Sequence, residues 1–157
     1  MFYIRSFRIG DEKEIYQLFY DTVRNVNIKD YSAEQVDIWA PEKADLEKWR
    51  NSLDKNHTLV AVKKGTTQII GFFDLTAEGC LDRGYVHKDY QGQGVGHYLL
   101  LAMEDKGREL GFKELFSDVS ITAIPFMEKH GYVVEEKLTK IVSDVQFVNY
   151  RMRKTLK

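Results

Sequence analysis

The sequence predicts an α+β fold in which helices cover both faces of a mixed sheet. Strand-like runs follow one another with short connections between residues 57 and 87, as in an antiparallel meander. A glycine-rich turn at residues 91–96 then leads into an amphipathic helix, and a further apolar run at residues 113–118 follows that helix. Because strand, helix and strand are joined by a crossover, the last run should lie parallel to residues 80–87.

The bulk composition indicates one soluble globular unit, and we predict a single domain over residues 1–157. The 23 basic residues nearly balance the 24 acidic ones, so the net charge of -1 predicts neither a nucleic-acid nor a membrane partner. Cys80 is the only cysteine, which fits a reducing compartment. No apolar run reaches the roughly 20 residues of a membrane span, so we expect a cytoplasmic protein. No metal site is predicted.

The N-terminal residues predict a strand followed by a helix. Residues 2–9 alternate apolar and polar side chains, which indicates a strand, and Gly10 ends it. Asp11 and Glu14 match the D-x-x-E capping pattern, and apolar residues follow at helical spacing. We therefore expect a helix over residues 12–25.

Short helices joined by loops are predicted next. Ser32 and Gln35 repeat the capping pattern ahead of a second helix, and a further helix carries Leu46, Trp49 and Leu53. The two tryptophans of this region have two open interpretations. They are either core anchors or the walls of a pocket for a second substrate.

The rest of the chain supplies most of the predicted sheet. Residues 57–63 and 67–75 are β-branched and aromatic runs around a Lys-Gly-Thr turn, which predicts a hairpin, and residues 80–87 add a third strand. After the long helix and the strand at 113–118, we expect a short helix and two terminal strands, at residues 122–130, 132–140 and 146–154.

The turn Gln-Gly-Gln-Gly-Val-Gly at residues 91–96 is the main functional feature. Glycines let a backbone approach a ligand closely, and the free amides at a helix start favour an anion, so we predict a phosphate-bearing ligand. A P-loop needs Lys and then Ser or Thr after its last glycine, whereas His97 and Tyr98 follow Gly96. A Rossmann turn needs a glycine at position 97 and a strand that opens a βαβ unit. Here position 97 is histidine, and the preceding strand ends an antiparallel meander.

The pattern that remains is Q-x-x-G-x-G after the extended run Tyr85-Val86-His87, and it resembles the GNAT superfamily of acyl-CoA-dependent N-acetyltransferases. The likeness is closest to a bacterial branch mostly without assigned substrates, and it covers nearly the whole chain. Four further segments carry it: residues 4–7 with the following helix, 70–72, 119–132 and 147–152.

The resemblance implies acetyl-CoA as the acyl donor, bound where the strand at residues 85–87 splays from the strand at 115–118. Backbone groups of the first strand would pair with the pantetheine arm, as an added strand does, and the amides of the turn would hold the pyrophosphate. The residues implied in cofactor binding are Tyr85, Val86, His87, Gln91, Gly92, Gln93, Gly94, Val95, Gly96 and His97.

The implied reaction is transfer of acetyl to a primary amine of a small molecule, peptide or protein, by direct attack in a ternary complex. An ammonium must lose a proton, and the candidate bases are Asp82 and Asp118, although either could pair with an arginine or cap a loop instead. The N–H of Val86 is the expected donor to the carbonyl oxygen.

The proton donor to the departing thiolate is less well defined. Met127 stands where many family members carry a tyrosine, and a thioether cannot donate a proton. The candidate hydroxyls are Tyr132, Tyr150 and Ser120; water or unassisted departure are the other routes. Met127 also suggests an alternative function, a non-catalytic acyl-CoA-binding sensor. Homodimers are common in the family.

Overall fold

The computed structural model describes residues 1–157, and its seven strands form two sheets. The first sheet is fully antiparallel, in the order β1 (Phe2–Ser6), β2 (His57–Lys63), β3 (Ile69–Leu75) and β4 (Leu81–Val86). The second sheet has the order β5 (Glu114–Val119), β7 (Val145–Thr155) and β6 (Val133–Val142), also antiparallel. The predicted meander at residues 57–87 is therefore confirmed.

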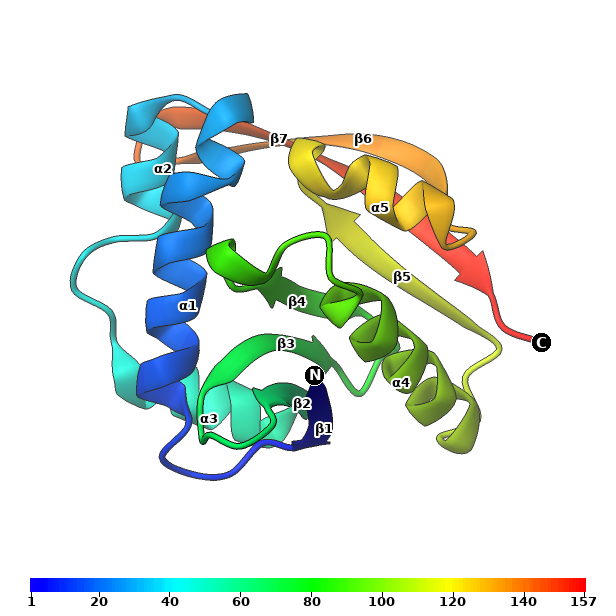
Figure 1. Ribbon diagram of the computed structural model, residues 1–157. Helices are drawn as coiled ribbons and strands as arrows, with labels where there is room; N and C mark the ends of the chain where they lie inside the picture. The colour runs from blue at the N-terminus through cyan, green and yellow to red at the C-terminus, as the bar shows by residue number, and fades with distance from the viewer.

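Helices cover both faces of the first sheet, as predicted (Figure 1). On one face lie α1 (Glu12–Asn25), α2 (Ala33–Trp39) and α3 (Leu46–Lys55), and on the other lies α4 (Val95–Glu109); α5 (Ile124–Lys129) lies over the second sheet. Three short 3₁₀ helices connect them, η1 (Asn27–Asp30), η2 (Lys88–Tyr90) and η3 (Ile121–Ala123). Each face has its own apolar core, so the α+β class is confirmed.

The two sheets meet at β4 and β5. The predicted parallel direction is confirmed, but the strands share a single bridge, between Cys80 and Phe116. Near it, the Ser117 hydroxyl donates to the Leu81 carbonyl at 2.7 Å. Beyond this contact the two strands belong to different sheets. The predicted mixed sheet is therefore divided into two sheets, which diverge toward the end of β4.

The bounds predicted for α1 are confirmed, but the predicted capping box at Asp11 and Glu14 is wrong. Arg5 on β1 takes both Asp11 oxygens, at 2.8 and 3.1 Å, and Glu14 accepts from the Ile69 amide at 2.7 Å. A bidentate arginine is a stronger partner than a helix amide, and it lowers the pKa of the Asp11 carboxyl against the effect of burial.

The second capping box is confirmed. The Gln35 amide donates to the Ser32 hydroxyl at 3.1 Å, and the Ser32 amide donates to the Gln35 side chain at 2.9 Å. No helix of the chain combines the length and the apolar character that a membrane span needs.

Candidate active site

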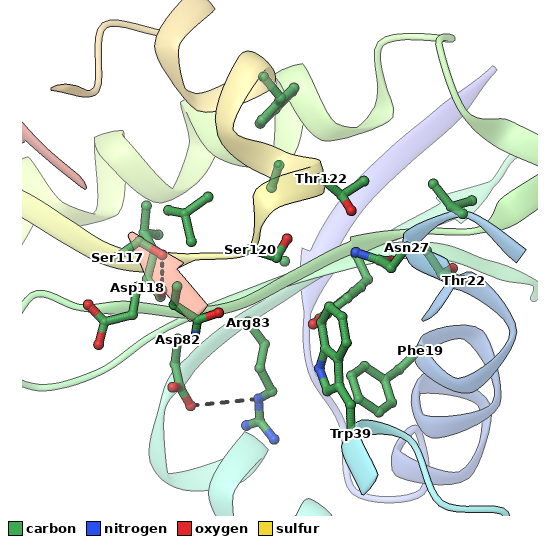
Figure 2. Close-up of a pocket in the computed structure, with 18 of the residues that line it drawn as sticks. Phe19, Thr22, Asn27, Trp39, Asp82, Arg83, Ser117, Asp118, Ser120 and Thr122 are labelled. Atoms are coloured by element: carbon green, nitrogen blue, oxygen red, sulfur yellow. Dashed lines mark hydrogen bonds and ion pairs between the residues drawn. The ribbon is translucent and has the colours of Figure 1, made fainter. Parts of the chain in front are cut away.

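A cavity of about 570 Å³ lies where β4 and β5 diverge. Residues of α1, α2 and α3 line it from one helical layer and residues of α4 and α5 from the other, so it runs between the two faces of the fold. Figure 2 shows Asp82 and Asp118 on one side and the rings of Phe19 and Trp39 on the other. The splayed strands thus enclose a space with an acidic side and an aromatic side.

The edge of β4 is exposed to this cavity at Val86. The His87 amide donates to Ile70 of β3 at 2.9 Å, so by the alternation of an antiparallel ladder the N–H and C=O of Val86 point away from β3. The Val86 carbonyl is held by the Thr22 hydroxyl at 3.0 Å and the Gln91 side-chain amide at 2.6 Å. Neither contact was predicted. Thr22 lies 64 positions from Val86, which no local pattern records, whereas Gln91 is only five positions away, within the predicted turn.

The glycine-rich turn leaves backbone amides free at the start of α4. Gly92 and Gly94 have φ of 72° and 86°, which glycine adopts without strain. Tyr98 is the first residue whose amide bonds back to Gly94, at 3.0 Å, so the preceding amides of the first turn lack helical acceptors. No side chain caps this end. The helix dipole adds to these donors, so the turn suits a phosphate.

Gly96, in the first turn of α4, is closely approached by side chains of α5 and β4. A Cβ placed on Gly96 would lie 3.3 Å from the Phe126 ring and 3.4 Å from the Val86 side chain. All three residues line the cavity. A side chain here would therefore have to displace one of these neighbours by a few tenths of an ångström.

The ten residues predicted to bind the cofactor are all at the end of β4 or in the turn and first helical turn after it. Four of them line the cavity itself: Tyr85, Val86, Gln91 and Gly96. The Tyr85 ring packs against Phe19 and Trp39, on the aromatic side, and burial raises its pKa. The His87 ring caps η2 by accepting from the Asp89 amide at 3.0 Å.

The two predicted bases both line the cavity but differ in their partners. Arg151 binds both oxygens of Asp118, at 2.8 and 3.1 Å. Asp82 has Arg83 at 3.8 Å as its nearest cation, and its side chain is 52% exposed. Partial desolvation in the cavity, and then the negative charge of Asp74, raise its pKa. Asp82 is therefore the carboxylate better suited to accept a proton.

Arg83 is bound more closely by Asp74, which is fully buried, than by Asp82. The Asp74 carboxylate accepts from the backbone amide of Arg83 at 2.7 Å and from its Nε at 2.9 Å, while the guanidinium lies 4.7 Å from the centre of the Trp49 ring. The sequence offered a signal for this, since Asp74 interrupts the apolar run of β3 and a buried charge needs a partner.

Tyr132, the third predicted catalytic residue, lies outside the cavity lining. Its hydroxyl donates to Glu104 at 2.7 Å, and Lys154 binds the same carboxylate at 3.0 and 3.1 Å. Burial and this carboxylate raise the pKa of Tyr132. This geometry favours a structural role for Tyr132, and its catalytic role stays a prediction. Of the hydroxyl candidates, Ser120 lines the cavity, beside Met127, and Tyr150 does not.

We expect Tyr132→Phe to lower the free energy of unfolding by about 1–3 kcal/mol, because the variant removes a buried hydrogen bond to the charged Glu104 carboxylate and leaves that oxygen with Lys154 alone. The turnover number should stay unchanged. Urea denaturation and initial rates measure the two quantities on the same sample. A large loss of turnover with unchanged stability would return Tyr132 to the reaction.

Three comparisons place the chain among known proteins. The family model described as "Acetyltransferase (GNAT) domain" matches residues 27–154. A GCN5-related N-acetyltransferase structure from Rhodopseudomonas palustris is 30% identical, with a TM-score of 0.92 over 98% of this chain and 95% of that one. The uncharacterized N-acetyltransferase YafP of Escherichia coli K12 is 29% identical over 96% of this chain and 93% of its own length.

More distant structures share the fold. The PaiA N-acetyltransferase of Thermoplasma acidophilum, crystallised in complex with coenzyme A, is 23% identical with a TM-score of 0.81, over 99% of each chain. The resemblance predicted from the glycine-rich turn is thus confirmed at the level of sequence family and of fold. The chain belongs to the GNAT family of acetyltransferases, whose cosubstrate is acetyl-CoA.

Proposed function

We propose that the protein transfers the acetyl group of acetyl-CoA to a primary amine of a small molecule, peptide or protein by direct attack in a ternary complex. One observation carries the proposal: a single cavity joins the exposed edge of β4 at Val86 to the carboxylate of Asp82. The first feature suits an acyl donor and the second an amine that must lose a proton. The whole chain, residues 1–157, would act as one domain.

The donor half of the cavity fits coenzyme A by its chemistry. The free amides of the turn at residues 91–97 would hold the pyrophosphate, and the exposed edge of β4 at Val86 would meet the pantetheine arm, whereas the amide of the predicted residue His87 is already bonded to β3. The open space beside Gly92, where a Cβ would meet nothing within 4 Å, leaves the turn accessible. The bound thioester supplies an acyl group that is already activated toward an amine.

Three further residues would stabilise the carbonyl oxygen, deprotonate the ammonium and protonate the thiolate. The Val86 N–H, fixed by the strand, would donate to the carbonyl oxygen as negative charge develops there. Asp82 would take the proton from the ammonium, directly or through one water. Of the three hydroxyls predicted from the sequence, Ser120 is the one that lines the cavity, and it would protonate the departing thiolate, since Met127 cannot donate.

The acceptor half lies among aromatic side chains. Phe19, Tyr31 and Trp39 line the cavity opposite Asp82, and Trp49 lies beside Arg83. Both interpretations of the tryptophans thus have support, because the same rings pack onto the core and face the cavity. We propose that they bind the apolar part of the amine.

Turnover and binding test the proposal together. We expect calorimetry to detect acetyl-CoA binding and a thiol assay to detect release of free CoA with members of a broad amine panel. Binding without turnover on every amine would favour the non-catalytic sensor, and absence of binding would refute both functions. Stabilisation by NAD or ATP that exceeds stabilisation by acetyl-CoA would indicate a nucleotide site instead.

A further inference from the structure

Two histidine rings connect the start of α4 to the end of α5. His97 lies in the first turn of α4, and His130 follows the last residue of α5. The His97 Nδ1 and His130 Nε2 atoms are 2.8 Å apart, and the His130 Nδ1 atom lies 2.8 Å from the Phe126 carbonyl oxygen. The carbonyl and the two rings therefore form one chain of hydrogen bonds, and the proposed catalytic steps use neither ring.

The Phe126 carbonyl determines where the hydrogen of His130 lies. The backbone amide of His130 bonds to Met127 at 3.1 Å, so the ring of His130, and not its amide, meets Phe126. A carbonyl oxygen can only accept, so Nδ1 of His130 carries a hydrogen. A neutral imidazole has a single N–H, so Nε2 of neutral His130 is a bare acceptor.

The hydrogen of His97 is determined by His130 in the same way. Because His130 Nε2 is an acceptor in the neutral pair, His97 Nδ1 must donate to it, and His97 Nε2 is left without a hydrogen. If the His97 tautomer is reversed, His130 must hold a hydrogen on both nitrogens and is charged. The His97–His130 pair can thus offer an outward N–H on His97 only after it has taken up one proton, whichever ring carries the charge.

His97 also belongs to the glycine-rich turn's set of free amides. Its own amide precedes the first helical bond of α4, which the Tyr98 amide makes to Gly94, and its side chain is exposed. A phosphate held by these amides would lie next to the base of the His97 side chain. A bare Nε2 would turn a lone pair toward the phosphate oxygens, whereas an N–H would donate to them.

The charges around the pair favour its protonated form only when an anion is bound. Neither ring has a carboxylate as an ion-pair partner; the histidine that has one is His87, 4.0 Å from Asp89. A positive charge at the start of a helix meets the positive end of the helix dipole, and a bound phosphate reverses that balance. The titratable groups on the elements around the pair are Tyr98, which packs on His97, Glu128 and Lys129 on α5, Lys154 on β7 near Gly131, and Lys88 and Asp89 ahead of the turn.

We propose that His97 donates to the pyrophosphate of acetyl-CoA and that the His97–His130 pair takes up one proton from solvent as the cosubstrate binds. His130 is a positioning residue, because it fixes which nitrogen of His97 carries the hydrogen in the free protein. Affinity consequently falls as the pH rises, since each bound molecule requires a proton. The inference rests on the acetyl-CoA site of the proposed function, but not on the transfer of acetyl to an amine.

Calorimetry in buffers with different heats of ionisation, such as Tris and HEPES, counts the protons that binding takes up. At about pH 8, where an ordinary imidazole is mostly neutral, we expect the wild type to take up about one proton per acetyl-CoA. Acetyl-CoA without its 3′-phosphate should give the same count, because the pyrophosphate is the group that His97 meets. Between about pH 8 and 9 the dissociation constant should rise about tenfold.

Two variants separate this proton from a merely structural role of the rings. In His130→Leu, neutral His97 is free to place its hydrogen on Nε2, so we expect acetyl-CoA to bind without proton uptake and with little dependence on pH. His97→Gln should also bind without uptake, because an amide donates but does not titrate in this range. The matched control is His57→Gln, which removes the histidine at the start of β2, outside the cavity lining, and should leave the proton count unchanged.

The possible failures can be told apart. Wild-type binding without proton uptake overturns this inference and leaves the proposed acetyl-CoA site standing. Uptake that persists in both His130→Leu and His97→Gln assigns the proton to another group and overturns the inference. Uptake that disappears when the 3′-phosphate is removed overturns the contact with the pyrophosphate. Absence of acetyl-CoA binding to the wild type overturns the site and the inference together.

Discussion

Replacing Gly96 by leucine should weaken acetyl-CoA binding by roughly ten- to a hundredfold, which corresponds to an overpacking cost of about 1–3 kcal/mol. The physical reason is the narrow approach at this position. The Phe126 ring and the Val86 side chain leave room for a Cβ only by moving, and a larger side chain extends into the cavity between them. Isothermal titration calorimetry with acetyl-CoA measures the change.

A second glycine of α4 serves as the control. A Cβ on Gly107 would crowd Leu115 at 3.1 Å and Leu156 at 3.2 Å, in the core and outside the cavity lining. We expect Gly107→Ala to lower thermal stability while it keeps acetyl-CoA binding. Gly96→Ala should show an intermediate affinity. Wild-type affinity in Gly96→Leu would mean that coenzyme A does not pass this point.

The second large effect is expected at Asp82. We predict that Asp82→Asn lowers kcat/KM by about 10²–10⁴-fold, the usual contribution of a positioned general base, with acetyl-CoA affinity unchanged. The amide keeps the shape of the side chain but cannot accept the proton of an ammonium. Initial rates under subsaturating amine measure the loss.

The pH dependence gives an independent check on this assignment. In the wild type, the base works when deprotonated, so activity should fall as the pH falls through the pKa of Asp82, which burial and Asp74 raise above 3.8. In Asp82→Asn that limb should disappear, and the rate should climb with pH as more of the amine becomes neutral. The control is Asp118→Asn, where Arg151 already occupies the carboxylate. A larger loss in Asp118→Asn would assign the base to Asp118.

Local patterns predicted most elements of the fold because those elements depend on neighbours in sequence. The bounds of α1 follow from the apolar spacing of its own residues, and the second capping box follows from Ser32 and Gln35. The first capping box failed because Arg5, on another element, competes for Asp11. Likewise the crossover predicts that β4 and β5 are parallel, but the extent of their pairing depends on packing between sheets.

In the candidate active site, too, the local backbone features were predictable from the sequence and the long-range side-chain contacts were not. The glycine spacing predicts a phosphate turn, because the free amides and the close approach are both local properties of the backbone. The partners of the polar side chains are not local. Tyr132 and Glu104 are 28 positions apart, and Thr22 and Val86 are 64 positions apart. No spacing rule could tell that the first pair is structural or that the second supports the strand edge.

The single bridge between β4 and β5 also bears on which acyl groups the protein can accept. Along a continuous ladder, hydrogen bonds hold the two strands about 4.8 Å apart, and this separation can hardly change. Here a bridge at Cys80 and Phe116 ties the strands at one end, and beyond it their separation depends on side chains such as Phe126 and Met127. A longer acyl chain would therefore be admitted or refused by the volume of a few replaceable side chains, so donor chain length can evolve without rebuilding the sheets.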